Sequence, residues 1–136
     1  MQLNITTDYA IRVILYLGSH AKNEIVTSLD IAEALNIPHN YLAKVLRKLK
    51  EHGLIISISG SKGGYILGKD LETITLSEVL HIMERTMNMN CCLEPAGRCS
   101  RSASDSCKVR LHLLNAQKML EKDYFSATMD QFLSGF

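Results

Sequence analysis

The first twenty residues carry apolar side chains at helical spacing, namely Ala10, Val13, Ile14 and Leu17. This spacing predicts a helix with one buried face, which Thr6 or Thr7 is placed to cap. A second, shorter helix is expected over 28–35, because Thr27 is a favoured N-cap residue and Asp30 lies in the first turn. The chain therefore begins with two helices.

A brief break at 36–37 leads to a longer helix over 39–52. Pro38 suits the first helical position, and Gly53 is a natural C-terminal stop. The apolar residues of this helix form one stripe, made of Leu42, Val45, Leu46 and Leu49. Two helices joined by a tight turn, the second with exposed basic residues, are typical of a helix-turn-helix.

Alternation replaces helical spacing after Gly53. Ile56 and Ile58 alternate with serines, and a glycine-rich stretch over 60–64 precedes the run 65–67. This pattern predicts a two-stranded hairpin with a glycine-rich tip. A helix-turn-helix followed by such a hairpin is a winged helix, so the expected fold is mainly α with a small β-hairpin.

Three further helices are expected in the second half of the chain. Thr75 and Glu78 have capping-box spacing before a helix that ends near 84–85, and Thr128 and Gln131 have it before a last helix that ends near 133. Between them, apolar residues repeat at heptad spacing, at Val109, Leu113, Ala116 and Leu120. Such a short seam favours a long helix that contacts another helix, and here it predicts a dimerisation helix.

The 136 residues fit one compact domain with three regions. We expect a winged helix-turn-helix over 1–85, a cysteine-rich loop over 86–107 and the dimerisation and C-terminal helices over 108–136. No apolar run approaches the ~18 residues that a membrane span needs, and the N-terminus lacks the layout of a signal peptide. A cytoplasmic protein with no membrane partner is expected.

The net charge of +1 conceals a local excess of basic residues. Between His39 and Tyr65 there are five basic residues and one acid, a charge of +4, so the remainder carries −3. The candidate DNA contacts are Asn40, Tyr41, Lys44, Arg47 and Lys48 on the helix, and Lys62, Gly63 and Gly64 on the wing. A glycine tip with one lysine suits close approach to phosphates, although the glycines also suit a tight turn. A merely solvated helix is the alternative, but helix, wing and charge together favour double-stranded DNA as the partner.

All four cysteines fall in a polar stretch with almost nothing apolar to bury, at Cys91, Cys92, Cys99 and Cys107. Converging thiolates on a metal centre would hold such a stretch. Structural zinc sites typically use pairs ~2–4 residues apart, and the wider spacings here suit a bulkier cluster, with zinc or free thiols as alternatives. Asp8 lies in a first helical turn, where its charge favours the helix dipole. No nucleophile with a partner base and no paired catalytic carboxylates are visible, so neither an enzyme nor a small-molecule substrate is expected.

These residues resemble a known family over nearly the whole chain, the bacterial winged-helix regulators that include IscR, NsrR and RirA. The resemblance rests on Met1-Gln-Leu-x-x-x-Thr7-Asp8-Tyr9-x-x-Arg12, on Asn40-Tyr41-Leu42-x-Lys44, on the wing Gly60-x-x-Gly63-Gly64-Tyr65-x-Leu67-Gly68, and on the cysteine loop. It implies a homodimeric transcription factor, bound to a palindromic operator, that carries one iron–sulfur cluster per subunit on three cysteines.

Two departures refine what the resemblance implies. Arg110 stands where IscR-like members have a histidine ligand, and Ala43 and Ser59 replace a glutamate and an arginine of their DNA-binding region. NsrR-like members instead use an aspartate of the partner subunit, which matches Asp8. By this likeness the metal ligands are Asp8, Cys99, Cys107 and either Cys91 or Cys92, and a 4Fe-4S cluster is favoured over 2Fe-2S.

The function expected is a transcriptional regulator, of the repressor type, that senses nitric oxide, redox state or iron–sulfur status through this cluster. Two alternatives remain. One is a winged-helix regulator that uses zinc or thiol oxidation, and the other is an interaction module that does not bind DNA.

Overall fold

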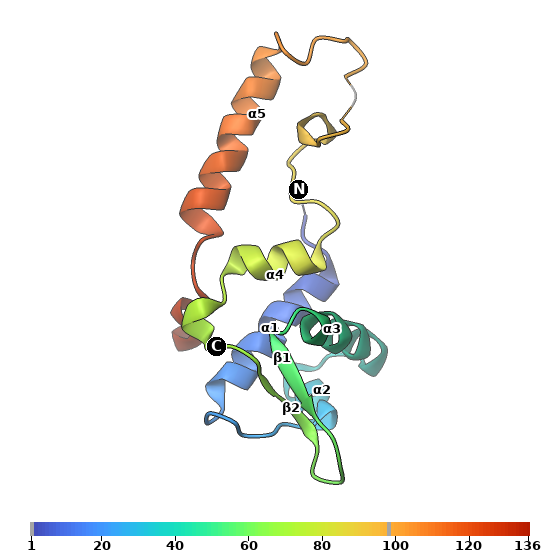
Figure 1. Cartoon of the computed structure of the whole chain (residues 1–136), viewed down its shortest axis with the longest axis vertical. Helices are drawn as coiled ribbons and strands as arrows, with labels where there is room; N and C mark the ends of the chain where they lie inside the picture. The colour runs from blue at the N-terminus through green and yellow to red at the C-terminus, as the bar shows by residue number, and fades with distance from the viewer. Residues whose placement is uncertain (1, 98) are drawn as a thin grey trace.

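The computed structural model describes residues 2–97 and 99–136, so Met1 of the N-terminal motif and Arg98 of the cysteine loop lie outside the described residues. Figure 1 shows a winged helix from which an arm projects, formed by helix α5 and the cysteine loop. The core packs around α1 (Ile5–Ser19), where Ala10, Val13 and Ile14 are fully buried. The predicted class, mainly helical with one small hairpin, is confirmed.

The start of α1 differs from the prediction that Thr6 or Thr7 caps it. Asn4 is the N-cap, and its side chain accepts a hydrogen bond from the backbone N–H of Thr6. Thr7 is instead fully buried and donates its hydroxyl to the carboxylate of Glu84, 2.5 Å away. Several capping residues stand side by side in the sequence, and a tertiary contact decides between them.

Helix α2 (Ser28–Leu35) begins where the sequence predicts. Thr27 and Asp30 form a reciprocal capping box, which satisfies two backbone N–H groups at this end. Asn36 ends the helix in the left-handed conformation at a φ of 50°.

Helix α3 (His39–Glu51) follows after a short turn. Pro38 is the N-cap and not the first helical residue, the position predicted for it, which His39 occupies. Gly53 adopts a φ of 73° just beyond the end of the helix. The predicted apolar stripe is the buried face of α3, made of Leu42, Val45, Leu46 and Leu49. These side chains fix α3 against the core and leave its other face outside.

The wing consists of β1 (Ile55–Ile58) and β2 (Gly64–Leu67), paired antiparallel from Ile55 opposite Leu67 to Ile58 opposite Gly64. The sequence did not predict a further backbone pairing. Val26 forms a bridge with Tyr65, with N···O distances of 3.0 and 2.8 Å, and so ties the wing to the segment before α2. Strand β2 is therefore held on both of its edges.

Helix α4 (Leu76–Met83) begins at the predicted N-cap, Thr75, whose hydroxyl accepts the N–H of Glu78. The reciprocal half of the expected capping box is not formed. The Glu78 carboxylate instead accepts a 2.7 Å bond from the ammonium of Lys69. Glu84 is the C-cap, so α4 ends close to the predicted position.

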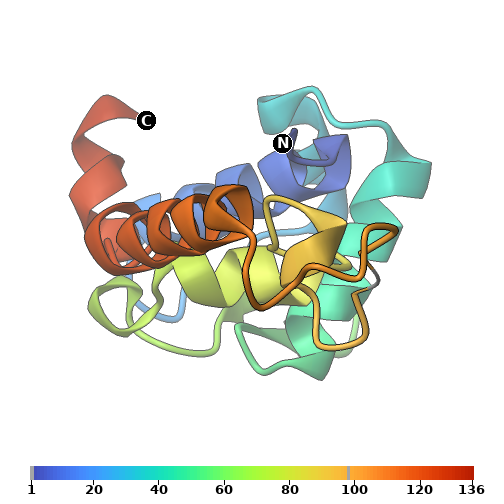
Figure 2. The ribbon, with the colours of Figure 1, turned by 90° about the horizontal axis from the view of Figure 1, so that it is seen from above.

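Helix α5 (Lys108–Met119) starts at Cys107, whose Sγ accepts the N–H of Arg110, and continues into a π-helical turn over Leu120–Tyr124. Of its residues, only Gln117 is buried. Seen from above, the arm lies over α4 (Figure 2). The predicted long helix is present, but in a single chain it contacts little of the core.

The chain returns to the core after α5 through a 3₁₀ helix, Met129–Gly135. Thr128 precedes it, but the expected capping box is absent, since the Gln131 side chain donates to the Thr128 hydroxyl instead. Met129 is fully buried, and its N–H donates to the carbonyl of Ile74.

Among the described residues, no helix has both the length and the apolar character needed to cross a bilayer.

Candidate DNA-binding surface and cysteine loop

The outer face of α3 carries most of the predicted DNA contacts. Asn40, Tyr41, Lys44 and Arg47 are all exposed there, opposite the buried stripe. Arg47 forms a 3.8 Å ion pair with Glu51 one turn later, but an exposed pair of this kind contributes little and is easily exchanged for another anion. The start of α3, where recognition helices usually meet base edges, is thus polar and accessible.

Aromatic and cationic side chains link this face to α1. Tyr41 meets Tyr9 edge to face, with ring centroids 6.0 Å apart. The Lys44 ammonium lies 5.8 Å from the Tyr41 ring, and the Arg12 guanidinium lies 5.8 Å from the Tyr9 ring. Such contacts restrict the rotamers of Tyr41 and Lys44, so these two side chains are partly ordered before any ligand arrives.

The wing tip presents Lys62 to solvent and places its glycines under steric constraint. Gly60 has a φ of 108°, which few other residues adopt. A Cβ on Gly63 would strike the carbonyl oxygen of Ile58, and one on Gly64 would strike that of Val26. The structural role considered for Gly63 and Gly64 is therefore present, whereas their contact with DNA stays a prediction.

Lys48 differs from the other cations of α3. Its side chain is half-buried, and its ammonium lies 3.4 Å from the carbonyl oxygen of Ile82 and 3.3 Å from that of Met83. These carbonyls belong to the last turn of α4, where backbone acceptors have no partner within the helix. This candidate DNA contact is thus engaged within the protein.

The cysteine loop contains side chains that can bind a metal centre, but in the part of the chain that the structure describes these side chains do not converge on one point. Cys91 is exposed and Cys92, Cys99 and Cys107 are half-buried, all as free thiols. Over residues 2–97 and 99–136, no three side chains of the histidine, cysteine or acidic type converge on one point. Thiolates in a polar, accessible loop are the ligands that iron–sulfur clusters use, so the donor set fits such a group, and closing the loop would have to bring the thiolates together.

Cys99 is the cysteine whose ionisation the loop favours. Hydrogen bonds from the backbone of Ala103 and of Arg101 lower the pKa of its thiol, and partial desolvation opposes them. The charge of Arg101 and the hydroxyl of Ser104 lower the pKa further. A thiolate is the form that binds metals and reacts with oxidants, so Cys99 is chemically prepared for either role.

Two side chains of α5 hold the first part of the loop. The Nε of Arg110 donates to the carbonyl of Cys92 at 3.0 Å, within the 3₁₀ turn Cys91–Leu93. The buried amide of Gln117 accepts the N–H of Met89 at 2.8 Å and donates to the carbonyl of Met87 at 2.9 Å. The segment before the cysteines is therefore fastened to α5.

Asp8 lies in the first turn of α1 and pairs with Arg12 one turn later, 2.5 Å away. Both side chains are about half exposed, at 45% and 44%. This arrangement agrees with the dipole role considered for Asp8, and its role as a metal ligand stays a prediction.

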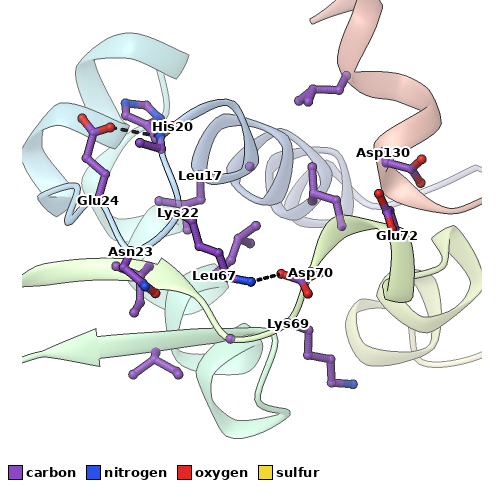
Figure 3. Close-up of a pocket in the computed structure, with 17 residues that line it drawn as sticks. Leu17, His20, Lys22, Asn23, Glu24, Leu67, Lys69, Asp70, Glu72 and Asp130 are labelled. Atoms are coloured by element: carbon purple, nitrogen blue, oxygen red, sulfur yellow. Dashed lines mark hydrogen bonds and ion pairs between the residues drawn. The ribbon is translucent and has the colours of Figure 1, made fainter.

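A separate cavity lies away from this surface. It measures about 680 Å³ and lies between the end of α1, the wing and the C-terminal 3₁₀ helix (Figure 3). Its Lys22 and Asp70 form an exposed ion pair at 3.1 Å, and neither a cysteine nor an outer-face residue of α3 is among its described lining residues. It brings together no set of donors or nucleophiles.

Comparison with known proteins agrees with this geometry. A family model described as Rrf2, iron-dependent transcriptional regulator, matches residues 3–135. The regulator NsrR of Bacillus licheniformis is 38% identical over 89 residues, covering 65% of this chain and only 62% of that relative. The regulator NsrR of Shouchella clausii is 35% identical over 107 residues, covering 72% of each chain.

Solved structures share the fold. CymR, the global cysteine regulator of B. subtilis, superposes with a TM-score of 0.80 at 20% identity, covering 100% of this chain and 98% of that one. IscR of T. potens superposes with a TM-score of 0.75 at 21% identity, covering 99% of this chain and 88% of that one. Fold and surface together define a winged helix-turn-helix regulator. The chain belongs to the Rrf2 family of transcriptional regulators, a family of non-enzymes, which confirms the predicted family and class.

Four residues that make long-range contacts near the candidate site could not be assigned these contacts from sequence. From sequence, Arg110 marks only the absence of a histidine, Lys48 only a DNA contact and Glu84 only the end of a helix, and Gln117 carries no prediction. Each acts through a partner at least 18 residues away, so the local pattern carries no signal for it. Gln117 is a polar residue type, which by itself gives no hint that the side chain is buried.

Proposed function

We propose that this protein is a homodimeric, cytoplasmic repressor that binds a palindromic operator and loses or gains that binding as an iron–sulfur cluster on its cysteine loop changes state. Membership of the Rrf2 family supports the regulatory role. The NsrR-like pattern of the sequence favours nitric oxide as the signal, with redox state or iron–sulfur status as related signals, and two relatives named NsrR support this likeness.

One observation carries the DNA-binding part of the proposal. The polar outer face of α3 and the exposed wing lysine Lys62 both belong to the stretch 39–65, which carries a net charge of +4. Lys44, ordered over Tyr41, is our first candidate for a base contact, and Arg47 and Lys62 are candidates for phosphate contacts. In a dimer, two such helices would enter successive major grooves ~34 Å apart.

The dimer would form through α5. Val109 and Leu111 are 68% and 59% exposed in a single chain, and Met119 is exposed as well. A long helix with exposed apolar side chains and one buried residue is a poor element for a monomer, whereas a second copy of α5 would cover it. A dimer would also bring Asp8 of the partner subunit near the cysteine loop, as the family likeness implies.

The cysteines would supply the regulation. Cys99, Cys107 and one of Cys91 and Cys92 are the proposed thiolate ligands, with Asp8 of the partner subunit as the fourth. When bound, a 4Fe-4S or 2Fe-2S cluster would supply a centre that reacts with nitric oxide or oxidants. A change of ~100-fold in operator affinity needs only ~2.7 kcal/mol between the two states of the protein, which ordering the loop could supply.

Thiol oxidation without a cluster is the second candidate. The lowered pKa of Cys99 favours it, and CymR of Staphylococcus aureus, which shares the fold with a TM-score of 0.74 at 21% identity, has been solved in an oxidized form. On this alternative the purified protein is colourless and its DNA binding follows reductant. A zinc-bound loop would be colourless as well but would contain zinc.

The metal part is tested by purifying the protein without oxygen and recording its visible spectrum with its iron and sulfide content. A brown protein with equal iron and sulfide supports the cluster, and iron per chain separates the two cluster types. The Cys99→Ala variant is expected to lose the absorbance. A colourless wild-type protein under these conditions overturns the cluster and leaves the DNA-binding part standing.

The DNA part is tested with a duplex enriched from a random library on the wild-type protein. Lys44→Ala is expected to weaken binding to this duplex by about 10-fold or more, because a specific base contact is worth ~1–3 kcal/mol. Lys50→Ala, on the same helix, is the matched control. Equal losses in the two variants would mean that only general charge matters, and failure to enrich any duplex would favour an interaction module.

A further inference from the structure

The carbonyl end of α4 is joined to α1 and to α3, the helix that carries most of the proposed DNA contacts. Glu84, its C-cap, accepts the backbone N–H of Asn4 at 2.8 Å and the hydroxyl of the buried Thr7, both from α1. The carbonyls of Ile82 and Met83 receive the ammonium of Lys48 from α3. The last turn of α4 therefore connects α1 and α3.

The same turn is the entrance to the cysteine loop. Met87 follows Glu84 by three residues, and its carbonyl is bound by the buried Gln117 of α5. Gln117 also binds Met89, two residues before the first cysteine. A movement of the loop relative to α5 thus has a short covalent path to the carbonyls that Lys48 contacts.

We infer that Lys48 is a positioning residue that couples the state of the cysteine loop to the orientation of α3, rather than a contact to DNA phosphate. This inference rests on the proposed regulation by the loop. A cation at the C-terminal end of a helix is stabilised by the free carbonyls and by the helix dipole. When the loop moves the end of α4, the carbonyls that bind the Lys48 ammonium move as well. The lysine side chain then transmits this displacement to α3.

Lys48 differs from the neighbouring lysines of α3 in the face of the helix on which it lies. Lys44 and Lys48 are one helical turn apart, yet Lys44 is exposed while Lys48 is half-buried. Lys50, two positions further, is exposed, and among the described residues its ammonium has no hydrogen bond or ion pair. Lys48→Met removes the ammonium and keeps an unbranched apolar stem, and Lys50→Met is a matched control on the same helix.

The decisive measurement is the ratio of operator affinities between the anaerobically purified, loaded protein and the metal-free protein, made on the enriched duplex. Residues within a coupling path typically change such a ratio by roughly 2- to 30-fold. In Lys48→Met, the ratio of the two operator affinities is expected to move closer to one, by a factor of roughly 2 to 30. Lys48→Arg, which keeps a cation of similar reach, is expected to restore most of it, and Lys50→Met is expected to leave it unchanged.

The salt dependence of binding separates the two roles of Lys48. Loss of a phosphate contact lowers the slope of log affinity against log salt by about one, whereas loss of a positioning contact leaves it unchanged. Lys48→Met with the wild-type slope and a smaller ratio supports the inference. A slope lowered by about one with an unchanged ratio overturns it and returns Lys48 to the DNA contacts.

Amide hydrogen exchange of the metal-free protein provides a reading that needs neither DNA nor cluster. Lys48→Met is expected to speed exchange of the Glu84 amide, which is bonded to Leu80 at the end of α4, while Lys50→Met does not. Unchanged exchange at Glu84 overturns the inference. One further outcome is a wild-type affinity ratio of one together with faster exchange of the Glu84 amide in Lys48→Met. This result would confirm the contact between Lys48 and α4, but it would overturn both the proposed regulation by the loop and the coupling inferred from it.

Discussion

At the scale of single residues, the cysteine loop depends on side chains that lie outside it. Arg110 binds the carbonyl of Cys92 from the first turn of α5, which orients the turn that carries Cys91 and Cys92. This arginine thus has a defined structural task at the position where the IscR-like pattern has a ligand. A residue that replaces a ligand histidine can therefore have a structural role of its own.

Replacing Arg110 by glutamine is expected to loosen the 3₁₀ turn Cys91–Leu93 in the metal-free protein. The hydrogen bond is partly buried and charged, and its loss at ~1 kcal/mol corresponds to about 5-fold faster amide exchange at Leu93 and Glu94. Lys108→Gln, an exposed cation of the same helix, serves as the control. Equal exchange rates in the two variants would contradict an anchoring role for Arg110.

Cys99 is expected to ionise at lower pH in the folded, metal-free protein than in the unfolded chain, because backbone hydrogen bonds from Ala103 and Arg101 lower its pKa. Such a group adds stability above its unfolded pKa and loses that contribution as pH falls through its folded pKa. The pH at which alkylation of Cys99 by iodoacetamide reaches half its maximum rate, followed by mass spectrometry, reports this. A midpoint equal to or above that measured in urea would refute the prediction.

At the scale of helices and strands, local sequence signals placed the elements well. Thr27, Gly53 and Thr75 act where their chemistry predicts, and the stripe of α3 is buried as expected. Signals failed where distant segments compete for the same group. Glu78 pairs with Lys69 instead of closing its capping box, and Val26 pairs with the wing, neither of which has a local pattern.

Helix α5 yields a test of the dimer. Val109 belongs to the heptad seam, whereas Leu111, two residues on, points about 200° around the helix. Since both are exposed in a single chain, a lysine at either position should leave the monomer folded. Val109→Lys is expected to shift sedimentation towards the monomer by at least 10-fold in dissociation constant, while Leu111→Lys is expected to have a smaller effect. The reverse order would move the interface to the other face.

At the scale of the whole molecule, the site divides into a part that sequence can predict and a part that it cannot. The cysteines, the polar face of α3 and the glycine-rich wing are local in the chain, so their residue types and order identify them. The contacts that join them, through Lys48, Glu84, Arg110 and Gln117, arise only when the chain is folded. The residues of each candidate part are therefore visible from sequence, but the contacts between the parts are not.

The return of the chain after α5 is expected to be a main support of the winged helix. Met129 is fully buried, and replacing it by alanine should lower the free energy of unfolding by ~2–4 kcal/mol, as for other buried large side chains. Phe132, in the same 3₁₀ helix, is 39% exposed, so Phe132→Ala should cost less. Urea denaturation measures both, and an equal loss would contradict the assignment of Met129 to the core.

The chain leaves the winged helix at Glu84 and rejoins it where the carbonyls of Phe125 and Ala127 accept the N–H groups of Ser77 and Leu76. The cysteines and α5 thus occupy one continuous stretch of the chain between two fixed junctions. Recombination at these junctions could exchange the entire stretch and leave the DNA-reading core intact. A lineage with this architecture could acquire a new signal without losing its operators.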